Sequence, residues 1–200
     1  MQDQGVKPDV VTYNLLLDGL LKDAQIDTAI SLGKERDKNG VAPDIFTFNI
    51  IINGLCEAGR LVEAVKVFSC IVAKRLGPDV TTYTTMIKGL CRQGLLGDAT
   101  KLLKEMADNG CPPNERTYNT ILQGFLKASD IATALDHHRV MRRQGFAADA
   151  HTASLFLGLL TARNVGDKDK ALLQKHFLDY EGEEKREGMK QIVIGNQEIE

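Results

Sequence analysis

The 200-residue chain carries 25 Lys and Arg against 27 Asp and Glu, and residues 181–200 hold six of the acidic and three of the basic side chains. The rest of the chain therefore has a net charge of +1, which excludes a nucleic-acid binder that relies on a strongly basic surface alone. No apolar run approaches the ~20 residues that cross a bilayer, so we expect no membrane partner.

A segment that begins with Pro-Asp or a close variant returns every 35 residues, at Pro8, Pro43, Pro78 and Pro113, and a weaker copy starts at Ala148. Self-similarity at a fixed period of this size is typical of stacked-repeat solenoids. The register predicts a remnant of a preceding repeat at 1–9, repeats at 10–44, 45–79, 80–114 and 115–149, a degenerate capping repeat at 150–180, and a disordered polar tail at 181–200.

Each repeat opens with a predicted amphipathic helix. Apolar residues occupy positions 4, 7, 8, 11 and 12 of the repeat, which is the one-sided stripe of a helix rather than the alternation of a strand. In the first repeat these are Tyr13, Leu16, Leu17, Leu20 and Leu21. A polar turn and a second stripe follow, with an alanine at one fixed position that lets two helices approach closely. These alanines are Ala29, Ala64, Ala99 and Ala134.

Glycine closes the first, third and fourth repeats, at Gly40, Gly110 and Gly145. Gly supplies the left-handed cap at the end of a helix. The second repeat has Arg75 at this position and Gly77 two residues later, so we expect a slightly different turn there. Together the elements predict an all-α fold, a right-handed α-solenoid of 35-residue helical hairpins with about four full repeats and a degenerate C-terminal one.

The repeat resembles a known family. The segment Phe46–Leu61 (FTFNIIINGLCEAGRL) and the segment Tyr83–Cys91 (YTTMIKGLC) are similar to the pentatricopeptide repeat in its plant P-class form, as found in fertility-restorer-like proteins. The similarity covers roughly residues 5–149 and extends weakly to about 180. A tetratricopeptide repeat has a period of 34 and different signature residues. The resemblance implies single-stranded RNA binding with one base per repeat, read by two or three side chains.

The resemblance also implies which residues read the bases. The pairs are Asn14 with Asp44, Asn49 with Asp79, Thr84 with Asn114, and Asn119 with Asp149. The family code then predicts the core 5′-UUAU-3′. Residues expected to pack on base faces are Val11, Phe46, Thr81 and Arg116. Lys22, Arg92 and Lys127 share one phase and are expected to contact phosphates, although Glu57 takes that phase in the second repeat. Ser154 with Glu184 would be a fifth pair, and we assign it no base.

Each of these residues has a plainer interpretation. An Asp or Asn directly before a helix is typical of an N-cap, which would explain Asp44, Asp79 and Asn114 without RNA. The asparagines in the first helical turn fit exposed polar positions. Tyr13 and its equivalents belong to the apolar stripe, so we predict core positions for them and not stacking platforms.

The sequence predicts no enzyme, no cofactor and no metal. The cysteines are Cys56, Cys70, Cys91 and Cys111. None of them forms a CxxC pair, so we expect reduced thiols rather than a zinc site. His137 and His138 have no Glu or Cys at ligand spacing. The chain also lacks the deaminase signature, a Gly-rich phosphate loop and a nucleophile elbow.

Two functions stay open from the sequence. The first is binding of single-stranded RNA in organellar RNA processing, stability or translation. The second is a helical-repeat scaffold for protein partners, which the near-neutral charge and the few repeats favour. Apart from these two functions, the chain could be a truncated product without a binding role. Four bases cannot specify one transcript, so we expect further repeats, a helper protein or self-association. Relatives are imported into mitochondria or plastids, but no presequence is visible here, which leaves the cytosol open.

Overall fold

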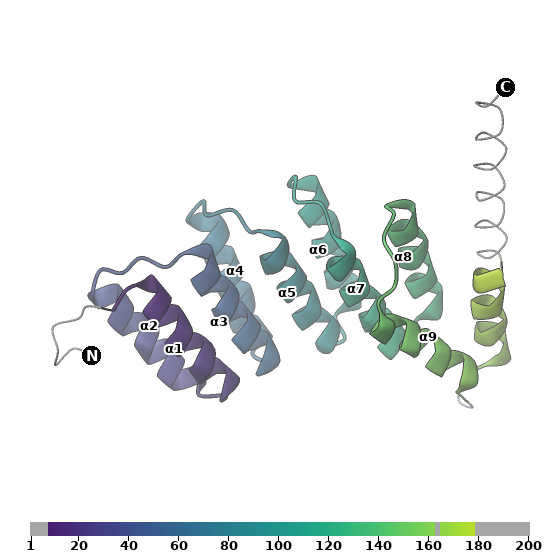
Figure 1. The fold of residues 1–200 in the computed structure, drawn as a ribbon, viewed down its shortest axis with the longest axis horizontal. Coiled ribbons are helices and arrows are strands. Elements are labelled where there is room, and N and C mark those ends of the chain that lie inside the picture. Colours follow the sequence, from purple (N-terminus) through teal and green to yellow (C-terminus); the bar gives the residue numbers. More distant parts are fainter. Residues whose placement is uncertain (1–7, 163–164, 179–200) are drawn as a thin grey trace, which may run out of the picture. The chain divides into compact units, whose positions relative to one another are not determined.

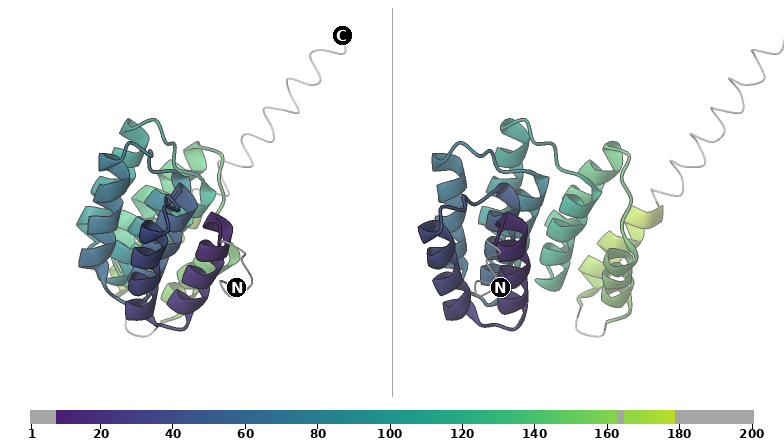
Figure 2. Two further views of the ribbon diagram at one scale, coloured as in Figure 1. Left: turned by 90° about the vertical axis from the view of Figure 1, so that its left-hand side faces the viewer. Right: turned by 60° about the vertical axis from the view of Figure 1, so that its left-hand side comes forward.

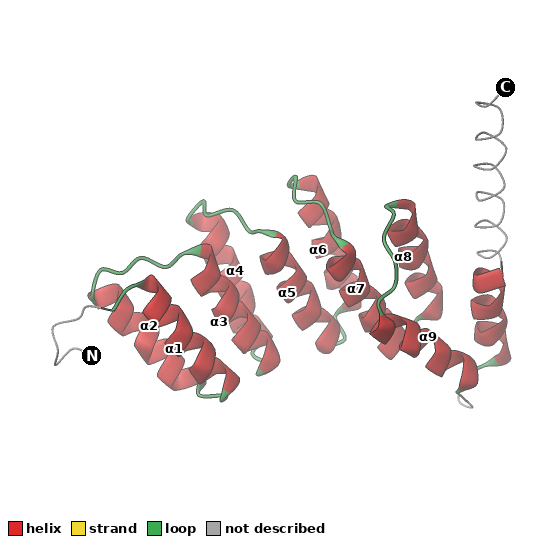
Figure 3. Cartoon of the chain, viewed as in Figure 1, coloured by secondary structure: helices red, strands yellow, loops and turns green. Residues whose placement is uncertain are grey.

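The computed structural model describes residues 8–162 and 165–178, and these residues form helices and loops without a strand (Figure 3). The helices are α1 (Val10–Lys22), α2 (Ile26–Lys38), α3 (Ile45–Glu57), α4 (Leu61–Ala73), α5 (Val80–Arg92), α6 (Leu96–Asp108), α7 (Glu115–Lys127), α8 (Ile131–Arg143) and α9 (Ala150–Thr161). Residues 167–178 are helical as well. None of the helices described here is long and apolar enough to span a membrane. The predicted polar tail at 181–200 and most of the predicted N-terminal remnant lie outside the described residues.

The chain divides into two compact units, Met1–Gly124 and Phe125–Glu200, and each is described by itself. In the first unit, α1 packs with α2, α3 with α4, and α5 with α6, so consecutive helices form hairpins (Figure 1). Helix α3 also packs against both α1 and α5. The odd-numbered helices of this unit therefore form one layer, and each carries its even-numbered partner on the other side (Figure 2).

The predicted helix stripes form the core. Tyr13 and Tyr83 are each 2% exposed and Tyr118 is 7% exposed, which confirms that the tyrosines are core residues. Asn39 and Asn109 donate to the hydroxyl oxygens of Tyr13 and Tyr83, at 2.8 and 2.9 Å. The buried tyrosine hydroxyls thus keep a hydrogen-bond partner, as burial of a polar group requires.

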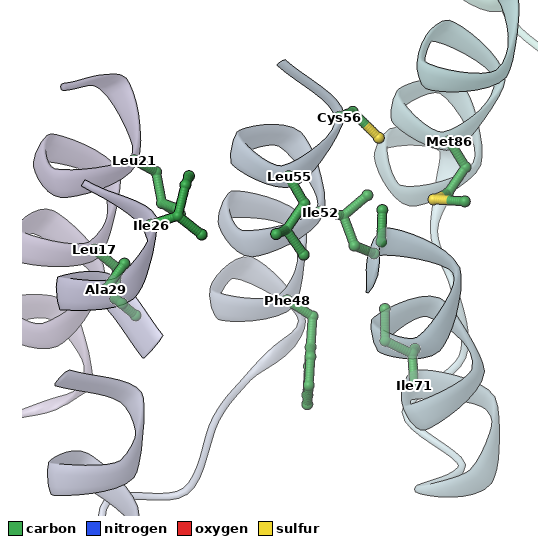
Figure 4. Close-up of a cluster of buried hydrophobic side chains, with 11 residues drawn as sticks. Leu17, Leu21, Ile26, Ala29, Phe48, Ile52, Leu55, Cys56, Ile71 and Met86 are labelled. Carbon is green, nitrogen blue, oxygen red and sulfur yellow. The ribbon is translucent and has the colours of Figure 1, made fainter. Parts of the chain in front are cut away.

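Figure 4 shows the cluster of buried side chains that joins the hairpins of the first unit. The recurring alanines are all buried, at 0–4% exposure, so the small residue does lie where helices meet. Leu16 departs from the pattern and is half-exposed, because no helix before α1 is described to cover it.

Glycine at position 10 lets neighbouring first helices touch. A Cβ atom added at Gly54 would lie 2.7 Å from the Cβ of Leu21, and one added at Gly124 would lie 2.8 Å from the Cβ of Cys91. Gly89 sits in the same way against Cys56. The glycine therefore packs on position 12 of the preceding repeat.

The second repeat ends differently from the others, but less than its sequence suggests. Gly40, Gly110 and Gly145 have φ of 71°, 73° and 80°, and Arg75 adopts the same left-handed conformation at φ 55°. The helix-ending hydrogen bond is kept, from the Leu76 N–H to the Ile71 carbonyl at 3.2 Å. The predicted difference is confined to Gly77, which adds a second positive φ of 65°.

Candidate nucleic-acid interface

The last residue of each repeat caps the next first helix. Asp44 and Asp79 have extended backbone and accept from the backbone N–H of Thr47 and Thr82, at 2.8 and 2.7 Å. Asn114 accepts from the Thr117 N–H at 3.0 Å. The N-cap interpretation of these residues is therefore confirmed. Asp44 and Asp79 have a second contact as well, because each carboxylate also accepts from an asparagine of the preceding odd-numbered helix.

Two of the proposed reading pairs are hydrogen-bonded. The Asn14 Nδ2 donates to Asp44 Oδ1 at 3.3 Å, although the residues are 30 positions apart. The Asn49 Nδ2 donates to Asp79 Oδ1 at 3.2 Å in the same geometry. The sequence register thus brings together the residues of the first two pairs, which we call the first and second junctions.

A buried threonine completes each junction. The Thr47 hydroxyl lies 2.7 Å from Asn14 Oδ1 and 2.8 Å from Asp44 Oδ1, and donates toward both. Thr82 repeats these two distances at the second junction. Both threonines are completely buried. They are not among the site residues predicted from the sequence, although a threonine at position 3 recurs in every repeat. These threonines are Thr12, Thr47, Thr82, Thr117 and Thr152.

The third junction has a different hydrogen-bond chain. The Thr84 and Thr117 hydroxyls are 2.7 Å apart, and Thr117 donates to Asn114 Oδ1 at 3.0 Å. Either hydroxyl of the Thr84–Thr117 pair could be the donor. Thr84 is 6% exposed, so this reading position lies deeper than Asn14 or Asn49, which are half-buried.

The two members of the fourth pair lie in different units. Asn119 is 3% exposed, and its Nδ2 donates to the Glu115 carbonyl oxygen at 3.1 Å. Asp149 caps α9 and accepts from the Thr152 N–H at 2.7 Å. Ser154 is exposed on α9, and Glu184 lies outside the described residues.

The four expected base-packing residues are exposed. Val11 is 58% exposed and Phe46 is 71% exposed, whereas Thr81 and Arg116 are exposed polar side chains. Each lies in the first turn of its helix, one residue before the junction threonine. An exposed aromatic ring here is free of the core and available for stacking.

Two of the expected phosphate-binding cations have acidic neighbours. Lys22 donates to Asp18 at 2.5 Å, one turn earlier on α1. Arg92 pairs with Glu57, which also accepts from Lys88 at 2.8 Å. Glu57 and Arg92 are 35 residues apart, so equal positions of consecutive repeats are spatial neighbours. The third cation, exposed Lys127, lies at the end of α7.

The junction carboxylates stay ionised at neutral pH. Burial raises the pKa of Asp44, but hydrogen bonds from Thr47 and Asn14 outweigh burial and leave the pKa below its usual value. The same balance, with Thr82 and Asn49 as donors, lowers the pKa of Asp79. An ionised carboxylate only accepts hydrogen bonds, which fixes the Asn Nδ2 toward it and the Asn Oδ1 toward the threonine.

His137 and His138 pack against aromatic rings. His137 stacks on Phe125 at a centroid distance of 5.2 Å, and His138 lies 2.8 Å from His176 between Nδ1 and Nε2. Over residues 8–162 and 165–178, no three potential ligands gather as a metal site would need. All four cysteines are free, and burial raises the pKa of Cys56 to about 11, which keeps that thiol protonated.

Family models match most of the chain. A model for the PPR repeat family matches residues 8–57, 43–92 and 78–127, and a model for the PPR repeat matches residues 116–146. The chain belongs to the pentatricopeptide repeat (PPR) family. No curated protein matches the sequence of this PPR chain.

Solved PPR structures share the fold. The complex of maize PPR10 with an 18-nt psaJ RNA element is 24% identical and has a TM-score of 0.74, over 88% of this chain and 27% of PPR10. The PPR domain of Arabidopsis thaliana protein-only RNase P 1, in complex with tRNA, is 19% identical and has a TM-score of 0.65, over 86% of this chain and 90% of that one. The chain spans about a quarter of the length of PPR10. These likenesses show that the PPR chain is an all-α helical-repeat solenoid.

Proposed function

We propose that this PPR chain binds single-stranded RNA along its junctions, one base per junction, with the core 5′-UUAU-3′. The observation that carries the proposal is the hydrogen-bonded Asn–Asp pair that recurs in the first and second junctions. The exposed Phe46 ring lies beside these pairs in sequence and supports it. PPR10, whose fold the chain shares, was solved with an RNA element bound.

In the first two junctions, the hydrogen bonds to Asp and Thr leave one edge of the Asn amide that is complementary to uracil. Asn14 uses one Nδ2 proton on Asp44 and one Oδ1 lone pair on Thr47. One N–H and one lone pair remain side by side on the amide. Uracil offers the complement, an N3–H donor next to a carbonyl acceptor. Asn49 has the same partners, so the second junction takes uridine as well.

The third junction suits adenine. With the Thr117 proton on Asn114, we propose that Thr84 donates to Thr117 and faces a base as an acceptor, which fits the N6 amino group. The Asn114 oxygen is bound to Thr117, which leaves its amino group as a donor for adenine N1. Guanine reverses both groups, with a carbonyl at position 6 and an N–H at position 1. Replacing Asn114 with Asp turns this donor into an acceptor for the guanine N1–H, and by the family code it should favour guanine.

Stacking and phosphate contacts would complete the interface. Phe46 offers a face for base stacking, worth about 1–3 kcal/mol per base for an aromatic side chain. Lys22, Arg92 and Lys127 are proposed to meet phosphates, with Arg92 shared between Glu57 and the RNA. The fourth uridine is assigned to Asn119 and Asp149 by the family code alone.

The experiment is fluorescence anisotropy with labelled RNAs that carry UUAU or UUGU in one neutral context. The wild-type chain should prefer UUAU, and Asn114→Asp should prefer UUGU. A lost base-edge contact costs about 1–3 kcal/mol, or about five- to 150-fold in affinity. Equal binding of both RNAs by both proteins contradicts the base assignment. No binding at low salt would indicate a protein-interaction scaffold instead.

The proposed setting follows the family resemblance. The chain would occupy an organellar transcript, in a mitochondrion or plastid, and act by shielding or remodelling it without chemistry of its own. A four-base site recurs in many transcripts, so specificity would require a helper protein, self-association or further repeats. Import of the full protein into isolated organelles tests the location.

A further inference from the structure

An arginine occupies a core position in the first repeat. Position 27 of the repeat is filled by Ile71, Met106 and Met141 in the second, third and fourth repeats, and each of these side chains is completely buried. The first repeat has Arg36 at this position, on α2, and Arg36 is only 5% exposed. A guanidinium group therefore takes the place of an aliphatic side chain.

The guanidinium of Arg36 has too few acceptors. Its Nη2 donates to Asp37 Oδ1 at 3.0 Å, and the Asp37 side chain is 66% exposed. Its Nε and Nη1 are buried and have no hydrogen-bond partner within the part of the chain that the structure describes. A buried charge with unpaired donors is strongly destabilising, and an aliphatic residue would remove that cost. The site therefore calls for an acceptor that the described residues, 8–162 and 165–178, do not supply.

Arg36 lines a cavity of about 730 Å³ between the first two hairpins of the first unit. The walls come from α1, α2, α3 and α4 and are mainly aliphatic, and Leu21 and Ile26 face Leu55 across this space (Figure 4). This size, with apolar walls and a few placed polar groups, is typical of a small-molecule site.

The charge around the cavity favours an anion. Its lining holds three basic residues, Lys34, Arg36 and Lys66, against two acidic ones, Asp37 and Glu63. Glu63 is held by Arg60, through bonds of 2.6 and 2.7 Å from Nε and Nη2. Lys34 and Lys66 are exposed, so Arg36 is the buried cation among these three basic residues. Its planar guanidinium suits a carboxylate.

We infer that this cavity binds an aliphatic carboxylate, whose head group accepts from Arg36 and whose hydrocarbon chain lies on the apolar walls. The mainly aliphatic walls disfavour a nucleic-acid phosphate, because the hydrated ribose would lie against apolar side chains. The site is separate from the base-reading junctions, which lie at the N-terminal ends of the odd-numbered helices. The carboxylate proposal does not depend on whether the chain binds RNA.

The test is a titration of the full chain with octanoate, followed by ¹H–¹⁵N NMR of the Arg36 Nε–H and the backbone amides around Gly33. Octanol supplies the chain without the head group, and acetate the head group without the chain. Octanoate should give saturable shifts at these resonances and bind at least tenfold more tightly than either comparator. These three ligands on the wild-type chain decide the question without a variant.

Two variants separate the buried charge from the general surface charge. Arg36→Met places the residue of the third and fourth repeats at this position; it should fold, and it should lose the preference for octanoate over octanol. Lys66→Met removes an exposed cation from the same cavity and should weaken octanoate less than threefold. Octanoate binding no tighter than octanol, shifts that do not involve the cavity, or unchanged affinity in Arg36→Met would each overturn the assignment.

Discussion

The close contact at Gly89 gives a prediction with an internal control. Gly89 on α5 packs against Cys56 on α3, and an added Cβ would collide with the Cys56 Sγ and lie 3.1 Å from its Cβ. Gly19 occupies the same position of the first repeat, and a Cβ there meets no atom within 4 Å. Gly89→Ala and Gly19→Ala thus make the same chemical change in two different surroundings.

The two variants differ only in the clash. Replacing Gly with Ala in a helix stabilises it by about 0.8–1.0 kcal/mol, and this gain is common to both. Overpacking a core costs about 1–3 kcal/mol, and it applies at Gly89 alone. We therefore expect Gly19→Ala to be more stable than wild type by up to about 1 kcal/mol. Gly89→Ala should lie about 1–3 kcal/mol below Gly19→Ala.

Urea denaturation followed by circular dichroism at 222 nm measures the difference, since the chain has no Trp for fluorescence. Cys56→Ala provides a further check, because removing the Sγ should reduce the cost of Gly89→Ala. Residues in direct contact show coupling of about 0.5–3 kcal/mol in such a double-mutant cycle. If Gly89→Ala and Gly19→Ala unfold at the same urea concentration, the close approach of α3 and α5 is wrong.

Three more predictions concern a junction, a turn and the second unit. Thr82→Val should lose the preference for uridine at the second base, because the Asn49 amide is no longer oriented, while Thr82→Ser keeps it; equal uridine-to-cytidine affinity ratios in both would contradict this role. Ser129 has a φ of 59°, so Ser129→Gly should raise stability by about 1 kcal/mol in thermal denaturation, whereas Ser129→Ala should not. Burial, with a smaller effect of His176, lowers the pKa of His138 to about 4, so the folded state holds it neutral and the unfolded state takes up a proton below about 6.5. Stability of the second unit should then be complete above pH 6.5 and fall toward pH 4, and a His138→Phe variant with the same pH profile of urea midpoints would refute this.

Most of the fold could be predicted from the sequence, because it depends on interactions between residues that are close together in the chain. The apolar stripes and the turn glycines depend on residues within one hairpin, and the 35-residue period is the regular return of these features, so all three can be recognised along the chain. The same holds for the N-caps, because Asp44 and Thr47 are three residues apart. The pairing of Asn14 with Asp44 was predicted from the family resemblance, which places the reading residues at position 5 and at the last position of the repeat.

What the sequence alone determined is the repeat, its register and the family. Only the tertiary structure showed that Thr47 joins Asn14 and Asp44, because a threonine in a first turn has the same sequence pattern whether or not its hydroxyl crosses to another repeat. The sequence likewise could not predict that the Nε and Nη1 of Arg36 are buried without a hydrogen-bond partner among the described residues. A long side chain at a core position can reach solvent or remain inside, and the packing of the surrounding helices decides which, since burial depends on atoms that come from several hairpins at once.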